Sequence, residues 1–138
     1  MKKFTHEYFM TDAVTLAQSL LGKVLIHETA EGVTSGIIVE TEAYIGPEDR
    51  AAHTFNNRRT KRTEILFHEG GYAYIYLVYG MYNCLNVTAN IAGKPECVLL
   101  RALQPIGGIS LMQFRRNSLK NLCNGPGRLC CAMGITRE

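Results

Sequence analysis

The stretch from residue 72 to residue 103 constrains the fold more than any other part of the sequence. It contains YAYIYLV, in which tyrosine alternates with smaller apolar residues, then YGMY, NCLNVTAN, IAGKPE and CVLLRAL. Short runs rich in β-branched and aromatic residues, separated by turn sequences, are typical of antiparallel strands. We therefore predict consecutive strands over 72–78, 83–90 and 97–103, with a tight hairpin turn at YGMY.

The flanking segments carry helical and further strand patterns. Apolar spacing predicts helices over 11–21 and 109–116, a short helix over 63–67 and another helix beginning at NGPGRLCCAMG, and it predicts a hairpin of strands 23–28 and 34–44. The segment 45–71 is otherwise a long loop, which in a compact domain is usually functional. The order of helix, strands and helices predicts an α+β fold with one curved antiparallel sheet, flanking helices and a protruding hairpin.

Length and cysteine content limit the class of protein. A chain of 138 residues fits one domain, so we expect residues 1–138 to form a single domain. No run approaches the roughly 20 apolar residues of a membrane span, and no apolar signal core follows the basic N-terminus. The five cysteines are an odd number without C-x-x-C spacing, which favours reduced thiols and a cytoplasmic protein.

Basic residues gather in the long loop although the formal net charge is only +3. The cluster consists of Arg50, Arg58, Arg59, Lys61 and Arg62. A charge run of this kind is commonly a solvated surface, and it also suits a surface that contacts phosphates. Charge alone favours the solvated surface, by about two to one.

The stretch VETEAYIGPEDRAAH, residues 39–53, contains the most suggestive acidic residues. Strand alternation puts Glu40, Glu42 and Tyr44 on one face, which is either a solvent face or the floor of an active site. A carboxylate beside an aromatic ring suits a site that stacks a base and activates a water. A second hypothesis uses Glu40, Glu42, Asp49 and His53 to hold magnesium in a phosphodiesterase.

Other polar residues interrupt apolar strands or turns. Arg101 interrupts the apolar run CVLLRAL. It is either an edge residue whose charge lies in solvent or a partner that keeps Glu42 ionised. Asn86 is either a buried hydrogen-bonding residue or an exposed strand residue. Tyr79 lies in the hairpin turn, where an aromatic ring can act as a wedge between bases. Arg128 follows NGPG, and a helix start of this kind can bind phosphate.

Several of these blocks occur together in one known family. VETEAYIGPEDRAAH, YIYLVYGMYNCLNV, CVLLRAL and NGPGRLCCA, in this order, resemble the alkyladenine or 3-methyladenine DNA glycosylases, the purine DNA glycosylase family. The resemblance implies an enzyme of base-excision repair that flips alkylated or deaminated purines out of duplex DNA. Such an enzyme hydrolyses the N-glycosidic bond and does not nick the strand. The lesions would be of the 3-methyladenine, 7-methylguanine and hypoxanthine class.

The resemblance also implies roles for individual residues. Glu42 corresponds to the catalytic acid, and Arg101 to the arginine that helps hold the attacking water. Tyr44, His53 and Tyr76 correspond to residues lining the base pocket. Two further residues correspond to family positions: Asn86 to the asparagine that excludes guanine, and Tyr79 to the tyrosine that fills the gap left by the flipped base.

The same resemblance implies partners and extent. The family needs no metal or organic cofactor, so we expect neither, and we expect a monomer that binds double-stranded DNA with damaged purines and no membrane. In a bacterium it would be associated with the nucleoid. The family normally continues beyond the end of this chain, so we expect a C-terminal part to be missing. A non-catalytic damaged-DNA-binding remnant is a third hypothesis.

Overall fold

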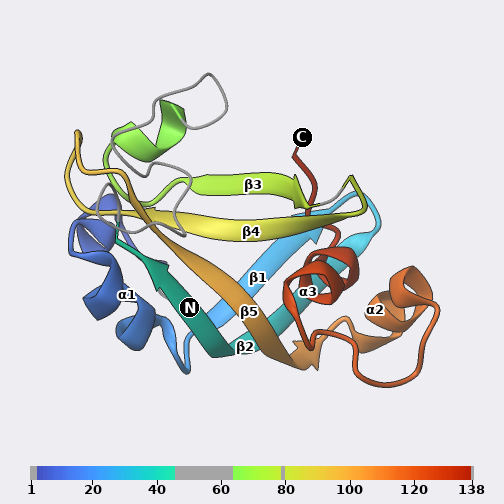
Figure 1. Cartoon of the computed structure of the whole chain (residues 1–138). Helices are drawn as coiled ribbons and strands as arrows, with labels where there is room; N and C mark the ends of the chain where they lie inside the picture. Colours follow the sequence, from blue (N-terminus) through green and yellow to red (C-terminus); the bar gives the residue numbers. More distant parts are fainter. Residues whose placement is uncertain (1–2, 46–63, 79, 138) are drawn as a thin grey trace. The chain divides into compact units, whose positions relative to one another are not determined.

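The structure is a computed structural model, and it describes residues 3–45, 64–78 and 80–137 (Figure 1). Its elements are η1 (His6–Phe9), α1 (Ala13–Leu20), β1 (Val24–Thr29), β2 (Gly32–Tyr44), η3 (Glu64–Phe67), β3 (Ala73–Val78), β4 (Tyr82–Ala89), β5 (Glu96–Gly107), α2 (Ile109–Arg116) and α3 (Pro126–Met133). The described strands form one five-stranded sheet in the order β1-β2-β5-β4-β3, with antiparallel pairing. The predicted α+β class with a curved antiparallel sheet is confirmed.

The described residues divide into two compact units. The first unit contains 3–19, 42–45, 64–74 and 86–99, and the second contains 20–41, 75–78, 80–85 and 100–137. Four strands, β2, β3, β4 and β5, contribute residues to both units. The single domain expected for residues 1–138 stays a prediction.

In the first unit, α1 is fixed at its start by side-chain hydrogen bonds. The Asp12 carboxylate accepts the Thr15 backbone N–H at 2.9 Å and the Thr15 hydroxyl at 2.9 Å. Both bonds lower the pKa of the Asp12 carboxyl, and the bond from the Thr15 backbone N–H has the larger effect. Ala13 N–H donates to Glu96 Oε1 at 2.9 Å, which ties the helix to β5. The predicted helix is thus confirmed, and it begins at Ala13.

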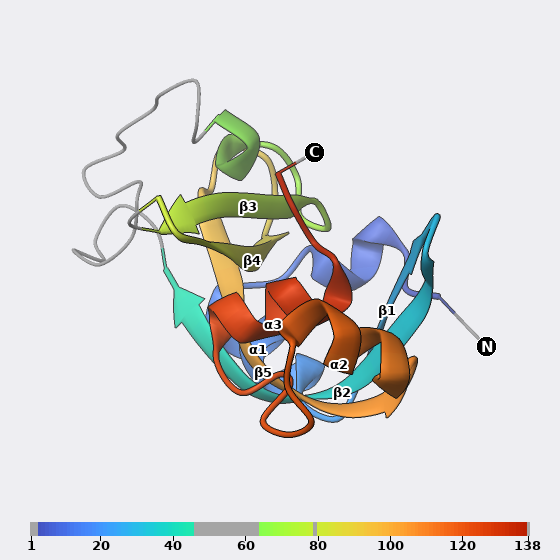
Figure 2. The same ribbon diagram turned by 90° about the vertical axis from the view of Figure 1, so that its right-hand side faces the viewer.

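In the second unit, α2 and α3 pack on the strands β1 and β2 (Figure 2). His27 on β1 donates to the Met133 carbonyl at 2.7 Å. The Arg115 side chain is only 8% exposed and donates to the Ala132 carbonyl at 3.0 Å and the Thr29 hydroxyl at 3.0 Å. It also forms a salt bridge with Glu31 at 2.9 Å. Arg115 therefore joins both helices to the β1–β2 hairpin.

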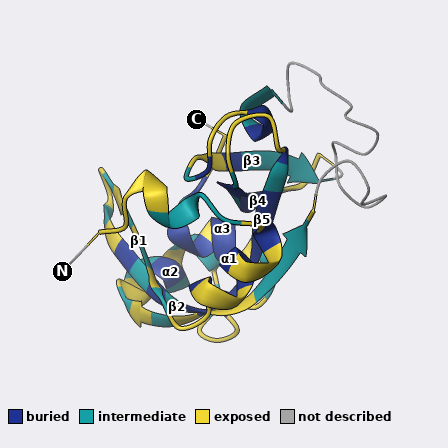
Figure 3. Cartoon of the chain, turned by 90° about the vertical axis from the view of Figure 1, so that its left-hand side faces the viewer, coloured by how far each residue is buried: buried dark blue, intermediate teal, exposed yellow. Residues whose placement is uncertain are grey.

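The core of this unit consists of apolar side chains from β5, α2 and α3. Figure 3 colours the ribbon by burial and shows buried stretches on β5 and α3. The largest fully buried apolar side chains of this core are Leu100, Leu103, Met112, Leu129 and Met133. Full burial of one such side chain contributes about 1.5–3 kcal/mol. This packing holds α3 and β5, which carry predicted site residues, in a fixed arrangement within the unit.

Two elements differ from the sequence predictions. The short helix η1 was not predicted, and β5 continues to Gly107 although the predicted strand ended at residue 103. Pro105 lies inside the observed strand. Proline lacks an N–H donor, but its fixed backbone angle is compatible with an extended strand, so it did not end β5.

Candidate active site

The end of β2 presents a carboxylate that is hydrogen-bonded within its own strand. Glu42 and Tyr44 are two residues apart, so their side chains lie on the same face. The Tyr44 hydroxyl donates to Glu42 Oε1, and both residues are half-buried, whereas Glu40 is exposed. The tyrosine bond fixes the orientation of the Glu42 carboxylate. The face is therefore not a uniform solvent face.

Asn86 is a buried hydrogen-bonding residue, which decides between the two interpretations of the sequence. It is 1% exposed, on β4, and lies opposite Leu99 on β5. Its amide nitrogen donates to the Tyr74 carbonyl at 3.4 Å. Its side-chain oxygen accepts the Cys97 thiol at 3.6 Å. These two contacts orient the amide, so the side chain presents a fixed pattern of donor and acceptor.

Arg101 lies on β5 and is half-buried rather than fully buried. Burial raises the pKa of the Cys84 thiol, while a hydrogen bond with the Tyr76 side chain and the Arg101 charge each act in the opposite direction. Two predicted site residues, Tyr76 and Arg101, therefore both act on the thiol of Cys84 in the second unit.

Six predicted site residues lie outside the described residues. They are His53, Tyr79, Arg58, Arg59, Lys61 and Arg62. Asp49, needed by the magnesium hypothesis, also lies outside them. Among the described residues, no group of three or more His, Cys, Asp or Glu side chains is placed to hold a metal ion. No helix in the described part of the chain is long and apolar enough to cross a membrane.

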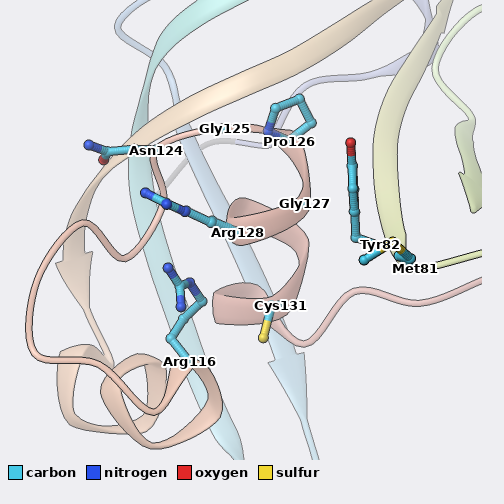
Figure 4. Close-up of a pocket in the computed structure, with 9 residues that line it drawn as sticks. All are labelled: Met81, Tyr82, Arg116, Asn124, Gly125, Pro126, Gly127, Arg128 and Cys131. Carbon is cyan, nitrogen blue, oxygen red and sulfur yellow. The ribbon is translucent and has the colours of Figure 1, made fainter. Parts of the chain in front are cut away.

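The start of α3 borders a pocket of about 650 Å³ (Figure 4). The pocket is lined by Met81, Tyr82, Arg116, Asn124, Gly125, Pro126, Gly127, Arg128 and Cys131. In Figure 4 the guanidinium groups of Arg116 and Arg128 point to the same side of α3. Two cations beside the free N–H groups of a helix start attract an anion such as a phosphate.

Sequence reasoning missed Arg116, which lies at the end of α2. Its guanidinium donates to the carbonyls of Leu122 at 3.2 Å and Asn121 at 3.3 Å. These bonds hold Arg116 against the loop that leads into α3. The only available signal was its position at the end of a predicted helix, where a basic residue is common for a different reason, the helix dipole.

Gly127 allows Tyr82 to approach the first turn of α3. A Cβ atom at Gly127 would lie 2.6 Å from Cδ2 and 3.0 Å from Cβ of Tyr82. Tyr82 begins β4, directly after the hairpin turn in which Met81 N–H donates to the Val78 carbonyl at 2.9 Å. The glycine therefore lets the base of the hairpin pack against α3.

A comparison with protein families decides which class of protein carries these sites. A family model described as methylpurine-DNA glycosylase matches residues 7–138. The chain belongs to this family. It is therefore a DNA glycosylase, a hydrolase of DNA repair, as the sequence resemblance implied.

Curated relatives cover nearly all of the chain. A protein of Clostridium acetobutylicum, named by inference as a 3-methyladenine DNA glycosylase, is 49% identical over 146 residues, which cover 99% of this chain and 71% of the relative. A protein of Bacillus cereus with the same name is 48% identical over 139 residues, covering 95% of this chain and 68% of the relative. The methylpurine-DNA glycosylase match thus includes β2, β3, β4, β5 and α3, on which the described candidate residues lie.

Proposed function

We propose that the protein extrudes an alkylated or deaminated purine from duplex DNA and hydrolyses its N-glycosidic bond with a water that Glu42 activates. The observation that carries the proposal is the half-buried Glu42 carboxylate, oriented by the Tyr44 hydroxyl at the end of β2. A carboxylate held in this way can accept a proton while its second oxygen faces a water.

The proposed reaction balances as a simple hydrolysis. The water oxygen bonds to C1′ of the sugar and gives its proton to Glu42. The bond between C1′ and the purine nitrogen breaks, and the purine leaves with the electron pair. Alkylation at N3 or N7 makes the purine cationic and a good leaving group, which reduces the need for a general acid. The negative Glu42 also stabilises positive charge that develops on the sugar.

The remaining site residues receive roles in this proposal. Arg101 helps hold the water, and Tyr44, His53 and Tyr76 line the base pocket. An aromatic wall favours a cationic purine by about 0.5–2 kcal/mol per contact. Asn86, whose amide is fixed by its two hydrogen bonds, excludes guanine by crowding its exocyclic amine.

A second set of residues binds the duplex. Tyr79 fills the gap that the extruded base leaves. Its ring stacks in place of the base and offsets part of the few kcal/mol that unstacking costs. Arg58, Arg59, Lys61, Arg62 and Arg128 contact phosphates. The pocket beside Arg128 supports this role, because Arg116 adds a second cation there. The protein would act as a monomer in the cytoplasm, on the nucleoid in a bacterium.

The experiment is incubation with a duplex that carries one hypoxanthine or one methylated purine, in the presence of EDTA. We expect free base and alkali-labile abasic sites, without direct strand breaks. Strand cleavage that EDTA abolishes would support the magnesium phosphodiesterase instead. Tight binding to the lesion without base release would support a non-catalytic binding protein. An undamaged duplex of the same sequence is the matched control.

A further inference from the structure

One face of β4 carries two buried polar side chains, Asn86 and Thr88. They are 1% and 0% exposed, and because they are two residues apart they share this face. Both are bonded to the chain at the start of β3, which neighbours β4 in the sheet (Figure 1). Asn86 Nδ2 donates to the Tyr74 carbonyl at 3.4 Å, and the Tyr72 N–H donates to the Thr88 hydroxyl at 2.8 Å. The Asn86 amide is thus held on its β3 side by a backbone carbonyl.

The other side of the Asn86 amide is bonded to Cys97 on β5. In the β4–β5 register, Asn86 lies opposite Leu99, and Thr88 lies opposite Cys97. Asn86 and Cys97 are therefore diagonal neighbours on one face of the sheet, a separation that side chains can bridge. The Cys97 thiol is 6% exposed and donates to Asn86 Oδ1 at 3.6 Å. All of these residues belong to the first unit, so one compact unit holds the amide from two strands.

The two partners determine which way round the Asn86 amide lies. A carbonyl can only accept a hydrogen bond, so the Tyr74 carbonyl selects the amide nitrogen. The Cys97 thiol hydrogen is a donor, so it selects the amide oxygen. A half-turn of the amide would place two oxygens against each other and remove the acceptor from the thiol hydrogen. Because these groups are buried, water cannot replace the lost bonds, and the half-turn is costly.

We propose that Cys97 is a positioning residue, whose thiol keeps the Asn86 amide in the orientation that excludes guanine. The inference rests on the proposed function, in which Asn86 crowds the exocyclic amine of guanine. In the observed orientation the amide nitrogen has a second N–H, and a donor repels the amine, whose hydrogens are also donors. After a half-turn, the amide oxygen would accept a hydrogen bond from that amine. The thiol therefore acts on the choice of base and not on the hydrolysis itself.

The contact between Cys97 and Asn86 is tested without enzymatic activity. In Raman spectra, the difference between the wild-type protein and Cys97→Ala assigns the S–H stretching band of this thiol. We expect Asn86→Leu to shift the band towards that of a thiol without a hydrogen bond. A second measurement needs only Cys97→Ala: the side-chain NH₂ signals of Asn86 should shift in NMR spectra and exchange their hydrogens faster. A band that does not move, or unchanged NH₂ signals, overturns the inference.

The role in selectivity is tested by base release from two duplexes that differ in one exocyclic amine. One carries 7-methylguanine and the other 7-methylhypoxanthine, and both bases are cationic and leave readily. We expect Cys97→Ala to raise the ratio of kcat/KM for 7-methylguanine to kcat/KM for 7-methylhypoxanthine by about threefold to tenfold, the effect of one hydrogen bond. Cys97→Ser keeps a donor and should restore most of the wild-type ratio. An unchanged ratio, or no recovery with serine, overturns the positioning role.

A matched control separates this role from a loss of stability. Cys123 is also a buried thiol, 0% exposed, and its Sγ contacts Met112 Sδ at 3.9 Å rather than a predicted site residue. Cys123→Ala should destabilise the protein and leave the ratio unchanged in folded protein. If Cys123→Ala raises the ratio as much as Cys97→Ala, the inference fails. A wild-type protein that releases neither base overturns the proposed function, and the Raman and NMR results then still decide whether Cys97 orients Asn86.

Discussion

The end of β2 and the start of α3 show two different uses of charged side chains. At the end of β2, the half-buried Glu42 carboxylate accepts a hydrogen bond from Tyr44, two residues along the same strand. At the start of α3, the exposed Arg128 lies with Arg116 on the wall of an open pocket. One region fixes a single acid, and the other presents positive charge over a wide opening.

The difference separates chemistry from binding. A proton acceptor works only at a defined position, so its side chain must be oriented by neighbours. A phosphate contact depends on charge and tolerates movement, so an exposed arginine suffices. We therefore expect changes at the end of β2 to reduce the rate of base release, and changes at the start of α3 to reduce binding.

The largest effect is expected from Glu42→Gln. Replacing the carboxylate by an amide removes the proton acceptor but keeps the shape, so base release should fall about 10²- to 10⁴-fold. Binding to the lesion duplex should change little. Single-turnover kinetics and a binding titration measure the two quantities separately. The control is Glu40→Gln on the same strand, where the side chain is exposed. An equal loss in Glu40→Gln would contradict the assignment of Glu42.

The next effect is expected from Gly127→Ala at the start of α3. Alanine favours the helix by about 1 kcal/mol, but its Cβ would lie 2.6 Å from Cδ2 of Tyr82, and overpacking costs about 1–3 kcal/mol. We expect the free energy of unfolding to fall by about 1 kcal/mol, measured by urea denaturation. Adding Tyr82→Ala should relieve the clash. A stability gain in Gly127→Ala alone would show that Tyr82 moves aside freely.

A smaller effect is expected from Arg128→Ala. Loss of one phosphate contact should weaken binding to any duplex. It should also reduce the slope of log K against log salt concentration by about 1. The rate of base release at saturating protein should stay the same. Binding titrations at several salt concentrations measure the slope. Lys120→Ala is the control, because Lys120 is exposed and does not line the pocket. The same change of slope in Lys120→Ala would mean that the effect is one of net charge only.

The smallest effect is expected from alkylation of Cys131, the one exposed thiol among the described cysteines. Burial raises the pKa of Cys123 to about 11 and that of Cys130 to about 12. Because the thiolate is the reactive form, these two stay unreactive near pH 8, and their labelling should rise only at higher pH.

Iodoacetamide near pH 8 should therefore modify Cys131 first, as mass spectrometry would show. The added group enters the pocket, so duplex binding should weaken by a few-fold. The rate of base release from the bound duplex should not change. Cys131→Ser should prevent both labelling and the loss of binding. Early labelling of Cys130 instead would contradict the packing of α3.

Local patterns were sufficient to predict most of the elements. The alternation of YAYIYLV and NCLNVTAN predicted β3 and β4, and the Gly-Pro sequence at residues 125–126 predicted the start of α3, because backbone preferences act over a few residues. The predictions were weakest where a distant partner decides the outcome. Whether Asn86 was buried could not be read from the sequence, since burial depends on what packs against β4.

The sequence by itself determined the order of strands and helices and the family to which the chain belongs, because both depend on residue types in local runs. Only the tertiary structure decided that Asn86 is buried and hydrogen-bonded to Tyr74 and Cys97, and that Arg116 joins Arg128 at one pocket. These residues are far apart in the chain. Strand register and helix packing bring them together, and both depend on burial of the whole apolar core.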